Sequence, residues 1–208
     1  MATLYYLYDP MCSWCWAYRP VLAQIDRALA NRPLQRINLL GGLAADSDAP
    51  MPPDQQQHIQ AIWRQIEQET GTRFNHRFWR DCQPRRSTYP ACRAVLAAEQ
   101  QQAGDAMIDA IGEAYYQRAM NPSDEDTLLQ LADELGLDFD RFAADLVSPA
   151  VDNTLQQQIT QVRSMPADGF PCWVLEQDGS YHRLPLDYHS AHVTLAALSD
   201  RLRPANED

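Results

Sequence analysis

The first 42 residues combine two apolar runs with one amphipathic segment between them. Residues 3–9 (TLYYLYD) are rich in β-branched and aromatic side chains, which predicts a buried strand. Residues 13–30 have a helical pattern, and residues 34–42 (LQRINLLGG) predict a second strand that ends at two glycines. One apolar stripe runs along the expected helix: Val21, Leu22, Ile25 and Leu29. Strand, helix and strand in this order predict a right-handed βαβ unit with parallel strands.

From about residue 50 to residue 165 the apolar residues recur at helical spacing, and no strand pattern interrupts them. A first stripe contains Ile59, Ile62, Trp63 and Ile66, and Gly71 closes that helix. Further helices are expected at residues 91–102, 106–120 and 127–135. Ser123 with Asp126 forms a capping-box signature before the third of these. Ser148-Pro149 indicates the start of another helix, with proline at its first position.

Beyond residue 165 the strand pattern returns. Residues 172–177 (CWVLEQ) and 181–186 (YHRLPL) flank Asp178-Gly179, a turn signal between antiparallel strands. A terminal helix is expected at about residues 190–202. The predicted fold class is therefore α/β, a βαβ…ββα framework interrupted by a large all-helical insertion domain. The chain is expected to divide into three parts: residues 1–48 (βαβ), residues 49–165 (helical insertion) and residues 166–208 (ββα).

Composition and charge restrict the possible partners. The chain has 208 residues, 45% of them hydrophobic, and a formal net charge of −11. Nucleic acid and anionic membranes are themselves negative, so neither is an expected partner. No run of about 18 apolar residues predicts a membrane span. The N-terminus MATLYYLYDP lacks the features of a signal peptide, so we expect a cytoplasmic protein with reduced thiols.

The strongest chemical signal is Cys12-Ser13-Trp14-Cys15, directly after the first strand and at the start of the first helix. Three interpretations compete: a redox dithiol, half of a zinc site, or two packing residues. A helix N-terminus stabilises the thiolate form that attacks disulfides. We expect Cys12 to be the exposed nucleophile, and Cys15, one turn deeper, to be the more covered resolving thiol. A zinc site needs four ligands, and no second Cys or His pair has suitable spacing.

The motifs YDPMCSWCW at residues 8–16 and Gly-Phe-Pro at residues 169–171, on either side of the helical segment, resemble the DsbA-type thioredoxin-fold disulfide oxidoreductases. The resemblance covers nearly the whole chain and is nearest to the cytoplasmic predicted disulfide-isomerase branch. It implies a thioredoxin fold with a helical insertion. It also implies Cys12 as the nucleophile, Cys15 as the resolving cysteine, and a cis peptide bond before Pro171. The backbone of Phe170 would then pair with a bound peptide.

Two positions depart from that pattern. Strongly oxidising members carry a histidine between the cysteines, and this chain has Ser13-Trp14. We therefore expect a less acidic Cys12, tuned by Ser13 and by nearby Asp9, and a less oxidising disulfide. Asp9 is expected to cap the following helix, with proton acceptance as the alternative. Cys172 replaces the threonine that is common after the proline, and we expect it to be a buried strand residue.

The remaining cysteines and tryptophans carry weaker signals. Cys82 and Cys92 flank a predicted helix–turn–helix corner, where either packing thiols or a second disulfide would fit. Trp14 is expected to face outward as an apolar contact for substrate. Trp16 is expected to pack against the sheet.

The predicted activity is thiol–disulfide exchange or isomerisation, with no metal or organic cofactor. Substrates would be peptide or protein disulfides, with glutathione or another small thiol as a possible co-substrate. Two alternatives stay open: a glutathione-dependent transferase or isomerase of the kappa/DsbA-like group, and a non-catalytic thioredoxin-like binding module. The oligomeric state is left open by the sequence.

Overall fold

The computed structural model describes residues 2–203, which contain a four-stranded sheet of order β2-β1-β3-β4. Strand β1 (Thr3–Tyr8) pairs in parallel with β2 (Gln35–Leu40). It pairs on its other side, antiparallel, with β3 (Cys172–Gln177), which continues into β4 (Ser180–Leu184). The central position of β1 agrees with its composition, because five of its six residues are buried.

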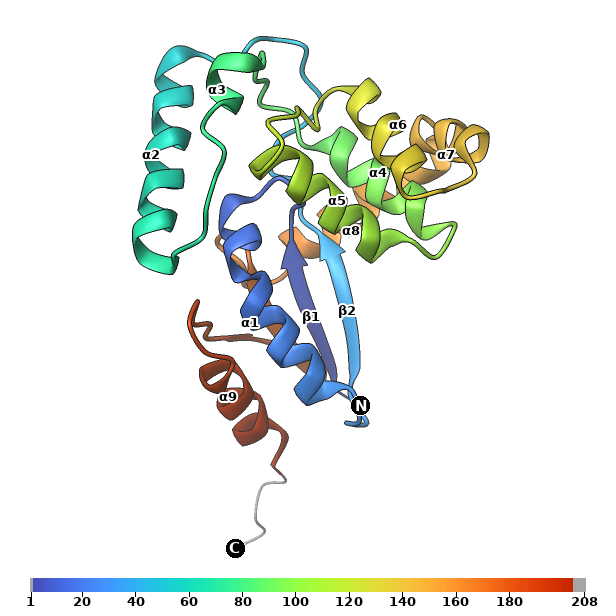
Figure 1. Cartoon of the computed structure of the whole chain (residues 1–208). Helices are drawn as coiled ribbons and strands as arrows, with labels where there is room; N and C mark the ends of the chain where they lie inside the picture. Colours follow the sequence, from blue (N-terminus) through green and yellow to red (C-terminus); the bar gives the residue numbers. More distant parts are fainter. Residues whose placement is uncertain (1, 204–208) are drawn as a thin grey trace, which may run out of the picture.

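Helices cover both faces of the sheet (Figure 1). Helix α1 (Ser13–Leu29) and helix α9 (His192–Leu202) pack on one face, which carries Tyr6 and Tyr8 of β1. Helix α8 (Pro149–Arg163) contacts β2, and its end packs with Met165 against the opposite face. The predicted βαβ unit and the late hairpin are therefore confirmed.

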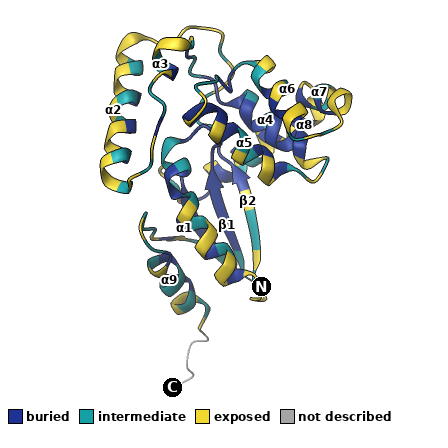
Figure 2. Ribbon diagram, in the orientation of Figure 1, coloured by how far each residue is buried: buried dark blue, intermediate teal, exposed yellow. Residues whose placement is uncertain are grey.

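The remaining helices gather beyond the carboxyl ends of β1 and β2, above the start of α1 (Figure 1). They are α2 (Pro53–Thr70), α3 (Phe78–Asp81), α4 (Tyr89–Glu99), α5 (Gly104–Tyr116), α6 (Glu125–Glu134) and α7 (Phe139–Leu146). Their core contains the fully buried Trp63, whose ring packs against Phe74, Phe78 and Tyr116. Burial is concentrated in β1 and α4, whereas α2 exposes one side to solvent (Figure 2).

Two helix starts test the predicted caps. Ser148 does cap α8, because its hydroxyl accepts a hydrogen bond from the Val151 N–H at 3.2 Å. The predicted capping box with Ser123 as the N-cap is wrong. Helix α6 begins after Asp124, and the Ser123 hydroxyl instead donates to the Ser87 carbonyl at 2.6 Å. The Ser123 hydroxyl, which the sequence pattern predicts as a helix cap, is therefore used in a contact with a distant part of the chain.

The predicted boundaries between the three parts, near residues 48 and 165, fall in segments without helix or strand. Helix α8 lies before the second boundary and nevertheless packs on the sheet. The division into domains stays a prediction, and residues 1 and 204–208 of the outer parts lie outside the described residues.

Candidate functional site

Cys12 lies at the point where the chain leaves β1 and begins α1. It is the N-cap residue, and its Sγ accepts a hydrogen bond from the backbone N–H of Cys15 at 3.4 Å. The first turn of α1 therefore points its free N–H groups and the positive end of its dipole at this sulfur. The predicted position of Cys12 at the start of this helix is confirmed.

Both cysteines are largely covered. Cys12 is 7% exposed and Cys15 is 8% exposed, so the expectation that Cys12 is clearly the more accessible of the two is wrong. The Cys12 Sγ donates to the Phe170 carbonyl oxygen at 3.3 Å. Burial raises the pKa of the Cys15 thiol well above its ordinary value, and the adjacent Cys12 adds to the shift. Cys15 is therefore held as a neutral thiol.

The peptide bond between Phe170 and Pro171 is cis, as expected, and it places the Phe170 carbonyl beside Cys12. The Phe170 ring lies against the backbone of Gly41, just after β2. A Cβ atom at Gly41 would come within 1.8 Å of the ring, so glycine is required for this approach. The turn thus joins three distant segments of the chain: the start of α1, the end of β2 and the start of β3.

Asp9 is completely buried directly beneath the cysteine motif. Its carboxylate accepts hydrogen bonds from the N–H groups of Met11 and Leu43, each at 2.8 Å, and from the Thr88 hydroxyl at 2.7 Å. Burial raises its pKa, and these donors oppose the shift. The expected helix-capping role is wrong, because Cys12 is the N-cap. Asp9 instead ties the end of β1 to the loops that precede α2 and α4.

The two residues between the cysteines have different surroundings. The Ser13 hydroxyl accepts from the indole N–H of Trp63 on α2 at 2.9 Å. Trp14 is half-buried and its ring packs on Tyr188, with 4.9 Å between centroids. Trp14 is thus only partly free to face outward. Nothing local in the sequence indicates that Trp63 or Tyr188 lies at the motif.

Trp16 does not pack on the sheet, as the sequence suggests, but on helix α5. Its ring lies 5.3 Å from that of Tyr116, and the guanidinium of Arg19 lies over the Trp16 ring, 4.2 Å from its centroid. Gly112 makes room for it, because a Cβ there would come within 2.5 Å of the indole. Gly112 is therefore the one feature of the sequence that points to a large side chain packed against α5.

All five cysteines are free thiols. Cys172 is buried on the opposite face of the sheet, as expected of a packing residue. Cys92 is fully buried, with its Sγ 3.7 Å from an Asp9 oxygen. Cys82 is half-buried and donates to the Ala119 carbonyl at 3.0 Å. No disulfide joins Cys82 to Cys92.

Within residues 2–203, no group of three or more His, Cys, Asp or Glu side chains is arranged to hold a metal ion. In the same part of the chain, none of the helices combines the length and the apolar character that crossing a membrane requires.

The chain matches one protein family over most of its length. The family described as "DSBA-like thioredoxin domain" matches residues 3–190 of this chain. The ClpXP adapter protein SpxH of Halalkalibacterium halodurans is 26% identical over 186 residues, which cover 84% of this chain and 58% of that protein. The chain therefore spans little more than half the length of this relative.

Two solved structures resemble the whole chain. A candidate protein disulfide isomerase from Nitrosomonas europaea has a TM-score of 0.82 and 25% identity, and the match covers 97% of each chain. The cytosolic disulfide reductase DsbM from Pseudomonas aeruginosa has a TM-score of 0.75 and 29% identity, covering 98% of this chain and 100% of that one. DsbM has also been solved with GSH, and that structure has a TM-score of 0.71 and 26% identity, covering 97% of this chain and all of that one.

Proposed function

Because this chain belongs to the DSBA-like thioredoxin domain family, we propose that it is a thiol–disulfide oxidoreductase that acts through Cys12 and Cys15. One observation carries the proposal. The Cys12 Sγ lies at the N-terminus of α1, 3.4 Å from the Cys15 N–H and 3.3 Å from the Phe170 carbonyl at the cis-proline turn. The likeness to the disulfide reductase DsbM supports this activity, and its cytosolic description supports the cytoplasmic location expected from the sequence.

The exchange proceeds in two steps. The Cys12 thiolate attacks one sulfur of the substrate disulfide, forming a mixed disulfide and releasing the other sulfur as a thiolate that takes up a proton. Cys15 then loses its proton and attacks the Cys12 sulfur. This forms the Cys12–Cys15 disulfide and releases the second substrate thiol. The enzyme dithiol is oxidised by two electrons, and the substrate disulfide is reduced by two.

Cys15 needs a proton acceptor, because burial keeps it neutral. Asp9 is the buried carboxylate next to the motif, and its own raised pKa suits a group that takes and returns a proton. We assign this role to Asp9 in place of the helix cap. The reaction uses sulfur chemistry alone and needs no metal or organic cofactor.

Substrate docks beside the cis-proline turn. The backbone N–H of Phe170 has no hydrogen-bond acceptor within residues 2–203, so it is free to pair with an extended peptide. Once Cys12 is ionised, the Phe170 carbonyl loses its donor and becomes available as well. Trp14 provides an apolar contact for the substrate. Peptide or protein disulfides fit this surface, and the DsbM structure with GSH supports glutathione as a small-thiol co-substrate.

The test is reduction of insulin disulfides with glutathione as the electron source. Cys12→Ser removes the nucleophile and should abolish turnover. Cys15→Ser should leave the first step intact and accumulate a mixed disulfide, seen by mass spectrometry as an adduct on Cys12. Cys172→Ala, on the opposite face of the sheet, is the matched control and should retain activity. Full turnover by Cys12→Ser would refute the proposal, and turnover by Cys15→Ser without an adduct would favour a glutathione transferase.

The direction of exchange depends on the reduction potential of the pair. No histidine lies between the cysteines, so Ser13 and Trp14 give the thiolate no cationic neighbour. We propose reduction or isomerisation rather than strong oxidation. Equilibration with glutathione buffers measures the potential. A value near that of strong oxidants would contradict this assignment.

A second function is favoured by the name of the curated relatives. Three of them, similar over 74% to 85% of this chain, are called ClpXP adapter proteins. We propose binding of a protease substrate as the alternative, in the manner of a thioredoxin-like binding module. The double variant Cys12→Ala, Cys15→Ala separates the two. An adapter would still accelerate degradation of its bound protein by ClpXP, whereas an oxidoreductase would lose its effect.

A further inference from the structure

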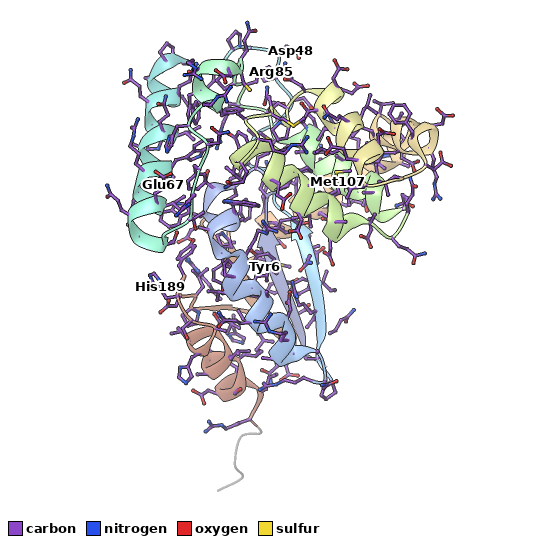
Figure 3. The ribbon with its side chains drawn as sticks, viewed as in Figure 1. Tyr6, Asp48, Glu67, Arg85, Met107 and His189 are labelled. Atoms are coloured by element: carbon purple, nitrogen blue, oxygen red, sulfur yellow. The ribbon has the colours of Figure 1, made fainter. Side chains whose placement is uncertain are left out.

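Cys92 is a buried thiol that the exchange reaction leaves unused. It lies on α4, four residues after Thr88, and it is fully buried. Helix α4 packs against α8 and against α5, which carries the buried Met107 labelled in Figure 3. A thiol sealed in this way is out of reach of a substrate disulfide, so Cys92 can act only through the groups that it touches.

The carboxylate of Asp9 is the polar group that Cys92 touches. The Cys92 Sγ donates to Oδ2 of Asp9 at 3.7 Å, and the Thr88 hydroxyl donates to the same oxygen at 2.7 Å. Residues four apart lie on one face of a helix, and here the Cys92 N–H also donates to the Thr88 carbonyl at 3.0 Å. Two side-chain donors from the first turn of α4 therefore converge on one oxygen of the buried acid.

The two oxygens of Asp9 have unequal surroundings. Besides the two donors from α4, Oδ2 accepts from the Leu43 N–H at 2.8 Å. Oδ1 accepts from the Met11 N–H at 2.8 Å, its one donor within residues 2–203. A carboxylate oxygen offers about two lone-pair sites, so Oδ2 is saturated and Oδ1 keeps one free. Because Met11 directly precedes Cys12, Oδ1 lies on the side of the cysteine motif.

We propose that Cys92 is a positioning residue for Asp9. Together with Thr88 it holds Oδ2, so that Oδ1 is the oxygen that takes the proton of Cys15. The inference rests on the proposed function, in which Asp9 accepts that proton. The Cys15 S–H bond breaks, its electron pair stays on the sulfur, and an O–H bond forms at Oδ1. The Cys15 thiolate then displaces the substrate sulfur from Cys12, and the released substrate thiolate takes up the proton.

The titratable groups around Asp9 come from four elements: Tyr8 on β1, Cys15 on α1, Cys92 on α4 and Tyr115 on α5. Burial raises the pKa of each of them, so all are neutral near neutral pH. Burial also raises the pKa of Asp9, and its hydrogen-bond donors oppose that shift. Beyond burial, hydrogen bonds rather than neighbouring charges thus determine how tightly Asp9 holds a proton. Removing the donor on Cys92 should tighten that hold.

The test follows the second step of the exchange as a function of pH. A mixed disulfide between Cys12 and a short cysteine peptide is formed in acid, the pH is raised, and mass spectrometry of acid-quenched samples follows the loss of the adduct. In Cys92→Ala the pH midpoint of this step should move upward, so that the rate below the midpoint falls about threefold. Cys92→Ser keeps an O–H donor and should shift the midpoint less. Cys172→Ala removes a buried thiol on the opposite face of the sheet and, as the matched control, should not shift it.

Asp9→Asn shows which group the midpoint belongs to, and thermal unfolding shows that each variant is folded. Loss of the midpoint in Asp9→Asn, together with its upward shift in Cys92→Ala, supports the inference. An unmoved midpoint in Cys92→Ala, even with slower exchange at every pH, would overturn it, and so would equal shifts in Cys92→Ala and Cys92→Ser.

The proposed exchange is judged by a different part of the same experiment. If Asp9→Asn keeps the midpoint, another group accepts the proton and the inference about Cys92 fails, while an adduct on Cys12 that is still resolved supports the exchange. If no adduct forms on Cys12 in the wild type, the proposed exchange itself is refuted.

Discussion

Gly41 offers the sharpest test of how the cis-proline turn is held against the end of β2. In Gly41→Ala, the new Cβ would lie 1.8 Å from the tip of the Phe170 ring and 2.4 Å from the next ring carbon. Contacts this short are not tolerated, so the ring has to leave its position. The backbone of Gly41 is outside the left-handed region, so alanine itself causes no strain there.

The magnitude follows from the cost of overpacking. Forcing an extra methyl group into a filled space typically costs about 1–3 kcal/mol of unfolding free energy. Because the Phe170 carbonyl lies 3.3 Å from the Cys12 Sγ, displacing this residue should also slow disulfide exchange. Both effects are expected in Gly41→Ala.

A double-mutant cycle measured by urea unfolding isolates the contact. Phe170→Ala removes a half-buried ring and should cost about 2 kcal/mol, roughly half the value for a fully buried one. In that background Gly41→Ala has no ring to strike, so its cost should fall to nearly zero. The coupling energy between the two positions should therefore be about 1–3 kcal/mol.

Gly169→Ala is the control, because it is adjacent to Phe170 and its Cβ would meet no atom within 4 Å. It should change stability by less than about 0.5 kcal/mol. Equal costs for Gly41→Ala with and without the Phe170 ring would refute the reasoning. So would a Gly169→Ala variant as unstable as Gly41→Ala.

The hydrogen bonds at the motif give two more predictions. Ser13→Ala leaves the buried Trp63 N–H without an acceptor and should cost about 1–3 kcal/mol in urea unfolding, whereas Ala at exposed Ser180 should be neutral. Thr88→Val removes a donor to Asp9 and should raise the pKa of that carboxyl further. A raised folded pKa means that stability falls as pH rises from the unfolded value, about 3.9, through the folded one. The Thr88→Val deficit should therefore grow as the pH rises through the folded pKa of Asp9, and a deficit independent of pH would contradict the assignment.

The sequence predicts those parts of the site that depend on local pattern. The Cys-x-x-Cys motif lies where an apolar strand meets an amphipathic helix, and both elements are present with nearly the expected bounds. The cis bond at Pro171 follows from the Gly-Phe-Pro motif and the resemblance it carries. Both signals are contained within about ten residues of chain, which is why they can be read without coordinates.

The contacts that surround the motif could not be predicted, because they join residues far apart in the chain. Trp63 reaches Ser13 across 50 positions, and Thr88 reaches Asp9 across 79. Neither partner has a local signature beyond being a helix residue or a turn residue. The local rules also failed where a tertiary bond was available: Ser123 gave its hydroxyl to the Ser87 carbonyl rather than to a helix start.

These long-range contacts also fix the position of the Cys-x-x-Cys motif. Ser13 bonds to α2, and Trp16 packs on α5, so the first turn of α1 is held by the helical insertion on two sides. The hydroxyl beside Cys12 is therefore oriented by Trp63 rather than by solvent. Because Ser13 only accepts this bond, its own O–H proton stays available as a donor. Trp63 on α2 thus fixes the orientation of one of the two residues between the cysteines, which makes α2 part of the surroundings of the motif.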